Sequence, residues 1–116
     1  PFATHMGMEV DEVREGYARC SLTVLPEYLN AVERVHGGVV YALADQALAV
    51  ASNSTGAASL SLSFTINYVA SAMEGEKIFS EAMPVNQGKK ISLWRVEVRG
   101  AEDRLIATGE AIAYHK

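Results

Sequence analysis

The chain has 116 residues, of which 49% are hydrophobic and 21% are charged, and its formal net charge is −4. This size and composition predict one globular domain over residues 1–116 rather than a disordered chain. The mildly acidic balance without a basic run argues against nucleic acid as a partner, and the lone cysteine, Cys20, excludes an internal disulfide framework.

Alternation of apolar and polar residues predicts that most of the chain forms antiparallel strands. In chain order, the predicted strands are 8–13, 17–24, 60–68, 77–85, 94–99 and 105–114. The alternation in 60–68 puts Leu60, Leu62, Phe64, Ile66 and Tyr68 on one face and Ser61, Ser63, Thr65 and Asn67 on the other. Residues 86–89 look like a hairpin turn, in which Gly88 would take a positive φ.

One segment, 39–51, breaks this pattern with an alanine- and leucine-rich run that is apolar on nearly every face. Such a run is typical of a helix that is buried on all sides. Gly37 and Gly38 precede it, and the polar run 52–56 ends it. The sequence therefore predicts an α+β fold, with a central helix wrapped by an antiparallel sheet of five or six strands.

The small uncharged side chains of Ser61, Ser63, Thr65 and Asn67 are unusual for a strand face that is open to water, where lysine and glutamate are common. A second subunit packed on this face would explain them. An ordinary solvated face with strand-forming serine and threonine is the alternative.

Asp45 is the carboxylate in the middle of this apolar helix, where Gln46 is its only polar neighbour. A buried carboxylate is costly unless it is paired or hydrogen-bonded. Asp45 could point out through a gap in the sheet or cap a neighbouring backbone group. The functional interpretation is a catalytic carboxylate, whose pKa the apolar helix would raise by desolvation.

The second candidate feature is His36-Gly37-Gly38 at the helix start. Bare N–H groups at a helix N-terminus can form an oxyanion hole. Asp45 lies nine residues after His36, which is roughly 13 Å along a helix axis. The two are therefore not expected to meet in one chain, and a homodimer with two shared sites is predicted.

The spacing of Asn30, His36-Gly37-Gly38 and Asp45 resembles that of hotdog-fold acyl-CoA thioesterases of the phenylacetate-degradation (PaaI) type. The similarity extends over essentially the whole chain. It includes the segments PFATHMGMEV, Leu43-Ala44-Asp45, Ala51-Ser52-Asn53-Ser54 and LSFTINYVASAMEG.

The resemblance implies a hotdog fold, assembly into homodimers and often homotetramers, and an acyl-CoA thioester as substrate. It implies that Asp45 acts as general base or nucleophile and that the Gly37 N–H polarises the thioester carbonyl. Asn30 would place the carboxylate or the water, and His36 would position the loop or the thioester. A hydroxyl on the following strand would orient the water, with Ser61 as the first candidate and Ser63 as the other.

The chain departs from the resemblance at two positions. Glu33 stands midway between Asn30 and His36, where the family commonly has glycine, and Ser71 stands where it often has proline. The first departure puts the role of Asn30 in question, whereas the second is expected to be structural.

Coenzyme A carries phosphates, yet no phosphate-cradling motif is present. Lys89 and Lys90 are the cations we assign to the substrate, together with Gly38 at the helix start and Ser63. A solvated strand end is the alternative for each cation. No metal and no cofactor are expected, because the three histidines are dispersed. Cys20 lies on the apolar face of its strand and is expected to be a core residue.

The predicted function is hydrolysis of an aryl- or fatty-acyl-CoA, and the alternative is a non-catalytic acyl-CoA-binding hotdog module. A hotdog dehydratase or hydratase is disfavoured, because the chain has no His-x-Phe-Pro-Gly or comparable motif. No signal-peptide pattern opens the chain, and the apolar run 39–51 is shorter than the ~20 residues of a membrane span. We therefore expect a cytoplasmic protein that does not contact a membrane.

Overall fold

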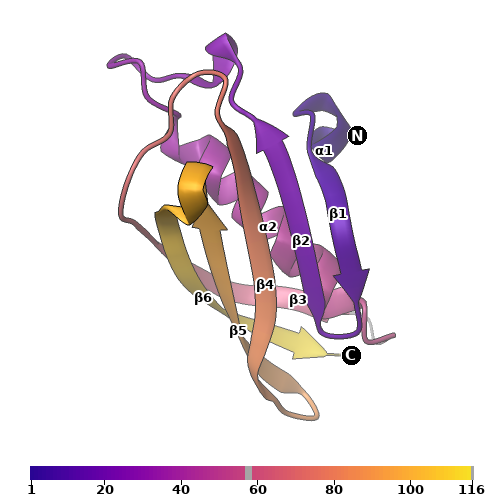
Figure 1. The fold of residues 1–116 in the computed structure, drawn as a ribbon. Helices are drawn as coiled ribbons and strands as arrows, with labels where there is room; N and C mark the ends of the chain where they lie inside the picture. Colours follow the sequence, from indigo (N-terminus) through magenta and orange to yellow (C-terminus); the bar gives the residue numbers. More distant parts are fainter. Residues whose placement is uncertain (57–58, 116) are drawn as a thin grey trace.

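The computed structural model describes residues 1–56 and 59–115, in which six antiparallel strands curl around one long helix (Figure 1). The strands are β1 (Glu9–Arg14), β2 (Tyr17–Thr23), β3 (Ser59–Tyr68), β4 (Lys77–Gln87), β5 (Ile91–Arg99) and β6 (Leu105–His115). The long helix is α2 (Gly37–Asn53), and the short helices are α1 (Phe2–His5), η1 (Pro26–Tyr28) and η2 (Ala101–Asp103). The expected α+β architecture is confirmed.

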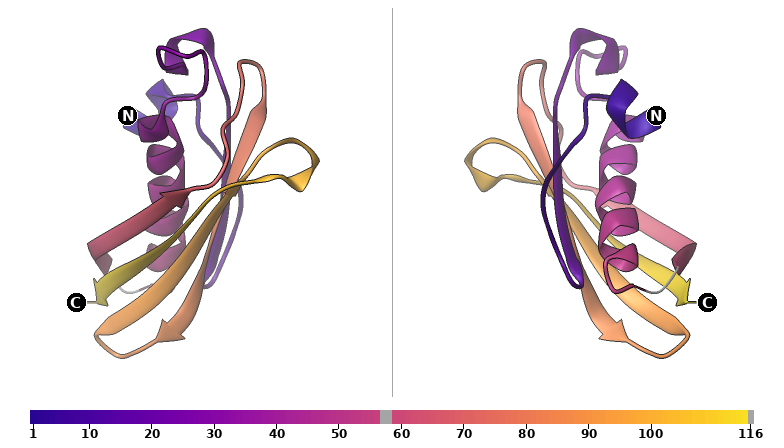
Figure 2. Two further views of the ribbon diagram at one scale, coloured as in Figure 1. Left: turned by 90° about the vertical axis from the view of Figure 1, so that its left-hand side faces the viewer. Right: turned by 90° about the vertical axis from the view of Figure 1, so that its right-hand side faces the viewer.

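The sheet has the strand order β1-β2-β4-β5-β6-β3, so β1 and β3 are its two edges. Figure 2 shows α2 lying along the concave side of the curled sheet. The core between these two layers contains the largest fully buried side chains, which include Trp94, Leu22, Leu43, Leu48, Ile78 and Ile106. These side chains come from the packed side of α2 and from the four inner strands β2, β4, β5 and β6.

The predicted alternation in β3 is wrong at its first residues, because the strand contains an irregularity between Ser61 and Ser63. Ser61 pairs with Ala113, a core residue, and Ser63 pairs with Ile112 on the outer face. Directly paired residues share a face, so Ser61 faces the helix side while Ser63 faces outward. An extra residue, Leu62, thus reverses the parity of the strand.

The prediction that the helix is buried on all sides is also wrong for the single chain. One side of α2 packs on the sheet through residues such as Leu43, Ala47 and Leu48. The opposite side is open, and Tyr41, Asp45 and Ala49 are exposed there. Their spacing of four residues places them on one helix face. A second open surface, the edge of β3, lies beside this face, because the rings of Tyr41 and Phe64 are in contact at 5.2 Å between centroids.

The hairpin between β4 and β5 differs from the predicted turn. β4 continues to Gln87, and Gly88 is not among the residues with positive φ. Glycine is required there for another reason, because a Cβ at Gly88 would lie 2.4 Å from the Ile91 carbonyl oxygen. Close approach of two backbones, rather than left-handed geometry, therefore selects glycine at this position.

Among the described helices, α2 included, none is long and apolar enough to cross a lipid bilayer.

Candidate functional site

The N-terminus of α2 is capped by His36, whose Nδ1 accepts a hydrogen bond from the Gly38 N–H at 2.8 Å. The Gly38 amide is therefore occupied within the chain, so the predicted contact of Gly38 with substrate would not use this N–H. The Gly37 N–H, in contrast, has no acceptor within residues 1–56 and 59–115. Because Nδ1 accepts, the proton of a neutral His36 is on Nε2, which makes that nitrogen a donor. The helix start thus offers the Gly37 N–H as its open backbone donor.

Tyr68, the last residue of β3, packs over the start of the helix. Its hydroxyl donates to the Gly37 carbonyl oxygen at 3.1 Å, and its ring carbons lie 3.5 Å from the position a Cβ would take on Gly37. Tyr68 pairs with Ala107, which is fully buried, so it is on the helix side of the sheet. The alternation in 60–68 could have placed Tyr68 on this face, but nothing in the sequence indicates its contact with Gly37.

Asp45 is exposed on the side of α2 that faces away from the sheet, so it does not point through the sheet, and its carboxyl has no hydrogen bond to a described backbone group. Desolvation by the apolar helix nevertheless raises the pKa of its carboxyl, and no hydrogen bond or opposite charge in the described part of the chain offsets this. An aspartate with a raised pKa and an open side is suited to accept a proton.

Gly37 and Asp45 are eight residues apart on one helix, which places them two turns apart on the same face, at about 12 Å. One chain therefore does not bring the free N–H and the carboxylate to one reacting group. The residue halfway between them on this face is Tyr41, which is 38% exposed. Sequence reasoning did not single out Tyr41, although its i+4 position between Gly37 and Asp45 is a signal.

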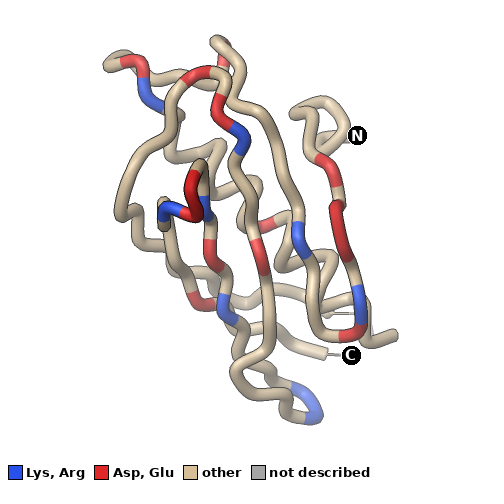
Figure 3. Tube along the Cα trace, viewed as in Figure 1, with Lys and Arg blue, Asp and Glu red and all other residues tan. Residues whose placement is uncertain are grey.

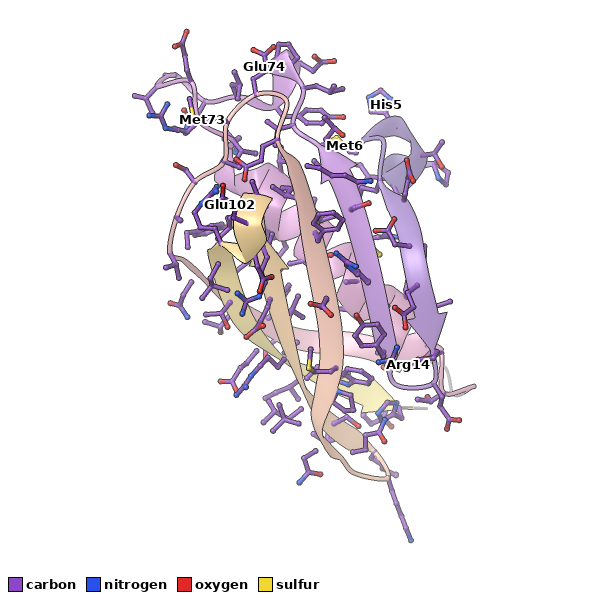
Figure 4. All side chains as sticks on the ribbon, viewed as in Figure 1. His5, Met6, Arg14, Met73, Glu74 and Glu102 are labelled. Atoms are coloured by element: carbon purple, nitrogen blue, oxygen red, sulfur yellow. The ribbon has the colours of Figure 1, made fainter. Side chains whose placement is uncertain are left out.

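Asn30 holds the loop that leads into the helix. Its side-chain Oδ1 accepts from the N–H groups of Val32 and Arg34 at 2.9 and 3.1 Å, and its own N–H donates to the Arg34 carbonyl. Glu33 has a φ of 61°, a left-handed conformation in which glycine is unstrained. The backbone at Glu33 therefore has the conformation that glycine would favour at this position of the loop. Met73 and Glu74, labelled in Figure 4, share a hollow with Leu29, Glu33 and Arg34 beside this loop.

Of the two candidate hydroxyls, the strand register places Ser61 on the side of the helix and Ser63 on the opposite face. Ser61 and Asp45 both lie beyond the Tyr41–Phe64 contact, away from the Tyr68–Gly37 contact. Ser61 therefore lies toward Asp45 on the helix side of the sheet, whereas the sheet separates Ser63 from Asp45.

Lys89 and Lys90 lie in the exposed β4–β5 hairpin, which appears as the basic tip at the bottom of Figure 3. Lys89 lines a hollow that also includes Thr55, just beyond the C-terminus of α2. Within one chain, the lysines are therefore at the C-terminal end of the helix and not beside the Gly37 amide.

Metal and thiol chemistry find no support in the part of the chain that the structure describes. No three His, Cys, Asp or Glu side chains among these residues gather closely enough to hold a metal ion. Burial, with a contribution from Asp11, raises the pKa of Cys20 to about 11. Cys20 is fully buried in the core, as expected.

Comparison with known proteins decides the family. The model of the thioesterase superfamily matches residues 33–107, which contain the helix, the Gly37 amide and Asp45. This chain belongs to the thioesterase superfamily. A protein of Archaeoglobus fulgidus that carries an esterase name is 42% identical over 103 residues, which are 89% of this chain and 67% of that protein. The acyl-coenzyme A thioesterase PaaI of Escherichia coli is 30% identical over 90% of this chain and 75% of that protein.

Solved structures show that the similarity to thioesterases extends over the whole fold. The E. coli PaaI protein superimposes with a TM-score of 0.96 at 27% identity, over 99% of this chain and 83% of that one. A variant of PaaI from Thermus thermophilus superimposes with a TM-score of 0.95 at 31% identity, over 100% and 99% of the two chains. The predicted PaaI-type hotdog thioesterase fold is therefore confirmed.

Proposed function

We propose that this protein hydrolyses the thioester of acyl-CoA substrates at a site shared between two chains. The observation that carries the proposal is the open face of α2, on which the Gly37 N–H and the Asp45 carboxylate lie without partners among the described residues. Thioester hydrolysis needs a base or nucleophile and a donor for the developing oxyanion. The similarity to the acyl-coenzyme A thioesterase PaaI supports coenzyme A as the leaving group.

A two-fold axis near Tyr41 would complete the site. It would place two α2 helices antiparallel, so that the Gly37 amide of each chain lies at Asp45 of the other. Tyr41 is halfway between these two residues on the open face, so one axis serves both sites. The proposed dimer requires no change in the fold of either chain.

The open edge of β3 supports the same dimer. Leu60 and Leu62 of this strand are each more than half exposed, and an unpaired edge strand recruits another strand. Because the Tyr41–Phe64 contact joins the helix face to this edge, one partner chain could cover both surfaces. Antiparallel pairing of β3 with its copy obeys the same two-fold symmetry as the helices.

In the proposed reaction, Asp45 takes a proton from a water molecule as the water oxygen attacks the thioester carbonyl carbon. The Gly37 N–H of the partner chain stabilises the oxyanion of the tetrahedral intermediate, aided by the positive end of α2. Collapse of the intermediate breaks the C–S bond and releases the acid and the coenzyme A thiolate, which takes up the proton. The alternative is direct attack by the Asp45 carboxylate on the thioester carbonyl carbon. This attack forms a mixed anhydride, which water then hydrolyses, and it is equally compatible with a shared site.

Three further residues have supporting roles in this proposal. His36 caps the helix through Nδ1 and can donate from Nε2 to the substrate. Asn30 holds the loop with Oδ1, which leaves its side-chain nitrogen to orient the carboxylate or the water of the partner. Ser61 orients the water beside Asp45 from the helix side of β3.

We assign Lys89 and Lys90 to the phosphates of coenzyme A. With the axis near Tyr41, the partner's Gly37 would lie beside Asp45, on the side toward the C-terminal end of α2. The hollow that contains Lys89 and Thr55 is at this same end. The exposed ammonium groups of the two lysines would therefore be nearer to the shared site than to the Gly37 amide of their own chain.

The outer face of the sheet would extend the dimer to a homotetramer. Ser63, Thr65 and Asn67 are on this face, and Ser61, which we also predicted there, is not. A shallow hollow on the same face contains Arg95 and Glu110, which are directly paired across β5 and β6. A face with both signs of charge can meet a copy of itself about a two-fold axis.

The function is tested by measuring thiol release from a panel of aryl- and fatty-acyl-CoA thioesters. We expect turnover with at least one substrate and a loss of at least ~10²-fold in Asp45→Asn, which keeps the shape of the side chain but cannot act as a base. Lys77→Gln, a change at an exposed residue of β4, is the control and should be as active as the parent. Binding of acyl-CoA without turnover would overturn the proposal in favour of a non-catalytic acyl-CoA-binding module.

A further inference from the structure

Tyr68 makes its polar contact with the backbone of the glycine pair that opens α2. Its hydroxyl donates to the Gly37 carbonyl oxygen at 3.1 Å, and its ring lies against the Gly37 backbone. The Tyr68 side chain is 52% exposed, so it adds less to the core than a buried aromatic residue would. The contact therefore needs an explanation other than packing alone.

The peptide group between Gly37 and Gly38 is held at both of its polar ends. Tyr68 donates to its carbonyl oxygen, and its N–H donates to His36 Nδ1 at 2.8 Å. The preceding peptide group, which carries the free Gly37 N–H, is held only at its carbonyl end, where the N–H groups of Val39 and Val40 donate to the His36 oxygen. The direction of the Gly37 N–H thus depends on the two peptide groups that meet at the Gly37 Cα.

Glycine has the greatest backbone freedom of any residue, and the first turn of a helix frays readily. Two consecutive glycines at this place would let the Gly37 N–H swing over a range of directions. An oxyanion hole is effective only when its donors are oriented before the reaction. A hydrogen bond that fixes the Gly37–Gly38 peptide removes one of the rotations through which the amide can turn away.

We propose that Tyr68 is a positioning residue that fixes the Gly37–Gly38 peptide and thereby aims the Gly37 N–H at the thioester oxygen. This inference rests on the proposed thioesterase function. Tyr68 acts through the backbone of Gly37 and forms no bond with the reacting atoms. Its effect is therefore on the transition state, where charge develops on the oxygen, more than on the binding of the ground-state substrate.

Tyr68→Phe tests the proposal, because it removes the hydroxyl and keeps the ring. We expect kcat to fall by about three- to tenfold, the loss that corresponds to one hydrogen bond, while KM stays unchanged. Tyr114→Phe is the matched control, since Tyr114 is a half-buried tyrosine of β6 whose hydroxyl has no hydrogen bond in the described chain. This control should leave kcat and KM as in the parent.

A spectroscopic measurement reports the contact independently of turnover. In protein with ¹³C- and ¹⁵N-labelled glycine, Tyr68→Phe should shift the Gly37 carbonyl resonance and speed hydrogen exchange at the Gly38 amide, and Tyr114→Phe should do neither. If Tyr68→Phe matches the parent in kcat while Asp45→Asn is inactive, the positioning role is refuted and the thioesterase function stands. If the parent itself releases no thiol from any acyl-CoA, the proposed function fails. Unchanged Gly37 and Gly38 resonances in Tyr68→Phe would refute the contact itself.

Discussion

The Gly37 amide and the Asp45 carboxylate lie on the same face of α2, two helical turns apart, and neither has a partner among the described residues. Both groups are chemically costly to leave without a partner once a second surface covers them. In the proposed dimer, a substrate and the second chain complete the arrangement. The predictions below test the amide, the carboxylate and the second chain separately.

The Gly37 amide can be removed without removing a side chain. Gly37 is the first helical residue, where proline is well tolerated, and His36 before it has φ −66° and ψ 136°, which suits a residue that precedes proline. Gly37→Pro should therefore fold normally and lower kcat by about 10²–10³-fold, as loss of an oxyanion donor does. Gly37→Ala keeps the N–H, and its Cβ would meet the Tyr68 ring at an ordinary 3.5 Å, so it should stay active. Equal activity of the two variants, measured by thiol release, would exclude the amide from the reaction.

Activity should depend on pH through Asp45, which must be ionised to act as base or nucleophile. Desolvation raises the pKa of this carboxyl, so the acid limb of kcat/KM should have its midpoint above the usual range of an aspartate. The limb should fall with unit slope as the pH decreases. A profile of kcat/KM that stays flat through the usual aspartate range would contradict this role of Asp45.

The same shift has a consequence for stability. Because the pKa of Asp45 is higher in the folded chain than in the unfolded chain, ionisation at neutral pH opposes folding. Asp45→Asn should therefore raise the free energy of unfolding at neutral pH, and the difference from the parent should vanish at a pH below the pKa of the unfolded carboxyl. Urea unfolding at both pH values measures this. A variant less stable than the parent at neutral pH would show that Asp45 has a stabilising partner.

The dimer should be sensitive to charge at Tyr41. A residue at a two-fold axis faces its own copy, so Tyr41→Arg would place two like charges together and should give an inactive monomer. Val13→Arg is the control, because Val13 is similarly exposed but lies on β1, at the other edge of the sheet. Sedimentation should show a dimer for the parent and for Val13→Arg. A Tyr41→Arg variant that remains a fully active dimer would place the axis elsewhere.

The strands could be predicted from the sequence because apolar and polar residues alternate in them, and the helix because its alanine- and leucine-rich run breaks this alternation. The details around Asp45 could not. Hydropathy shows that Tyr41 and Ala49 are suited to burial, but it does not show whether the same chain covers them, and in the single chain they are exposed. The assignment of Asp45 to a fully buried helix failed for this reason.

Local backbone features also could not be predicted from the pattern of apolar and polar residues. The extra residue at Leu62 reverses the faces of β3 before it, and strict alternation cannot reveal such an insertion. The reversal places Ser61 rather than Ser63 on the helix side. The occupation of the Gly38 amide by His36 depends on a side-chain rotamer, and the contact of Tyr68 with Gly37 depends on tertiary packing. Residue spacing in the sequence indicates neither of these two contacts.

The shared site is tested most directly by mixing two inactive variants, Gly37→Pro and Asp45→Asn, under conditions in which subunits exchange. In a mixed dimer with shared sites, one site carries both lesions and the other carries none. Random exchange of equal amounts should then restore about 25% of the parent's activity per total site. If Gly37 and Asp45 acted within one chain, every site would carry one lesion. No recovery despite exchange verified by mass spectrometry would therefore contradict the composite site.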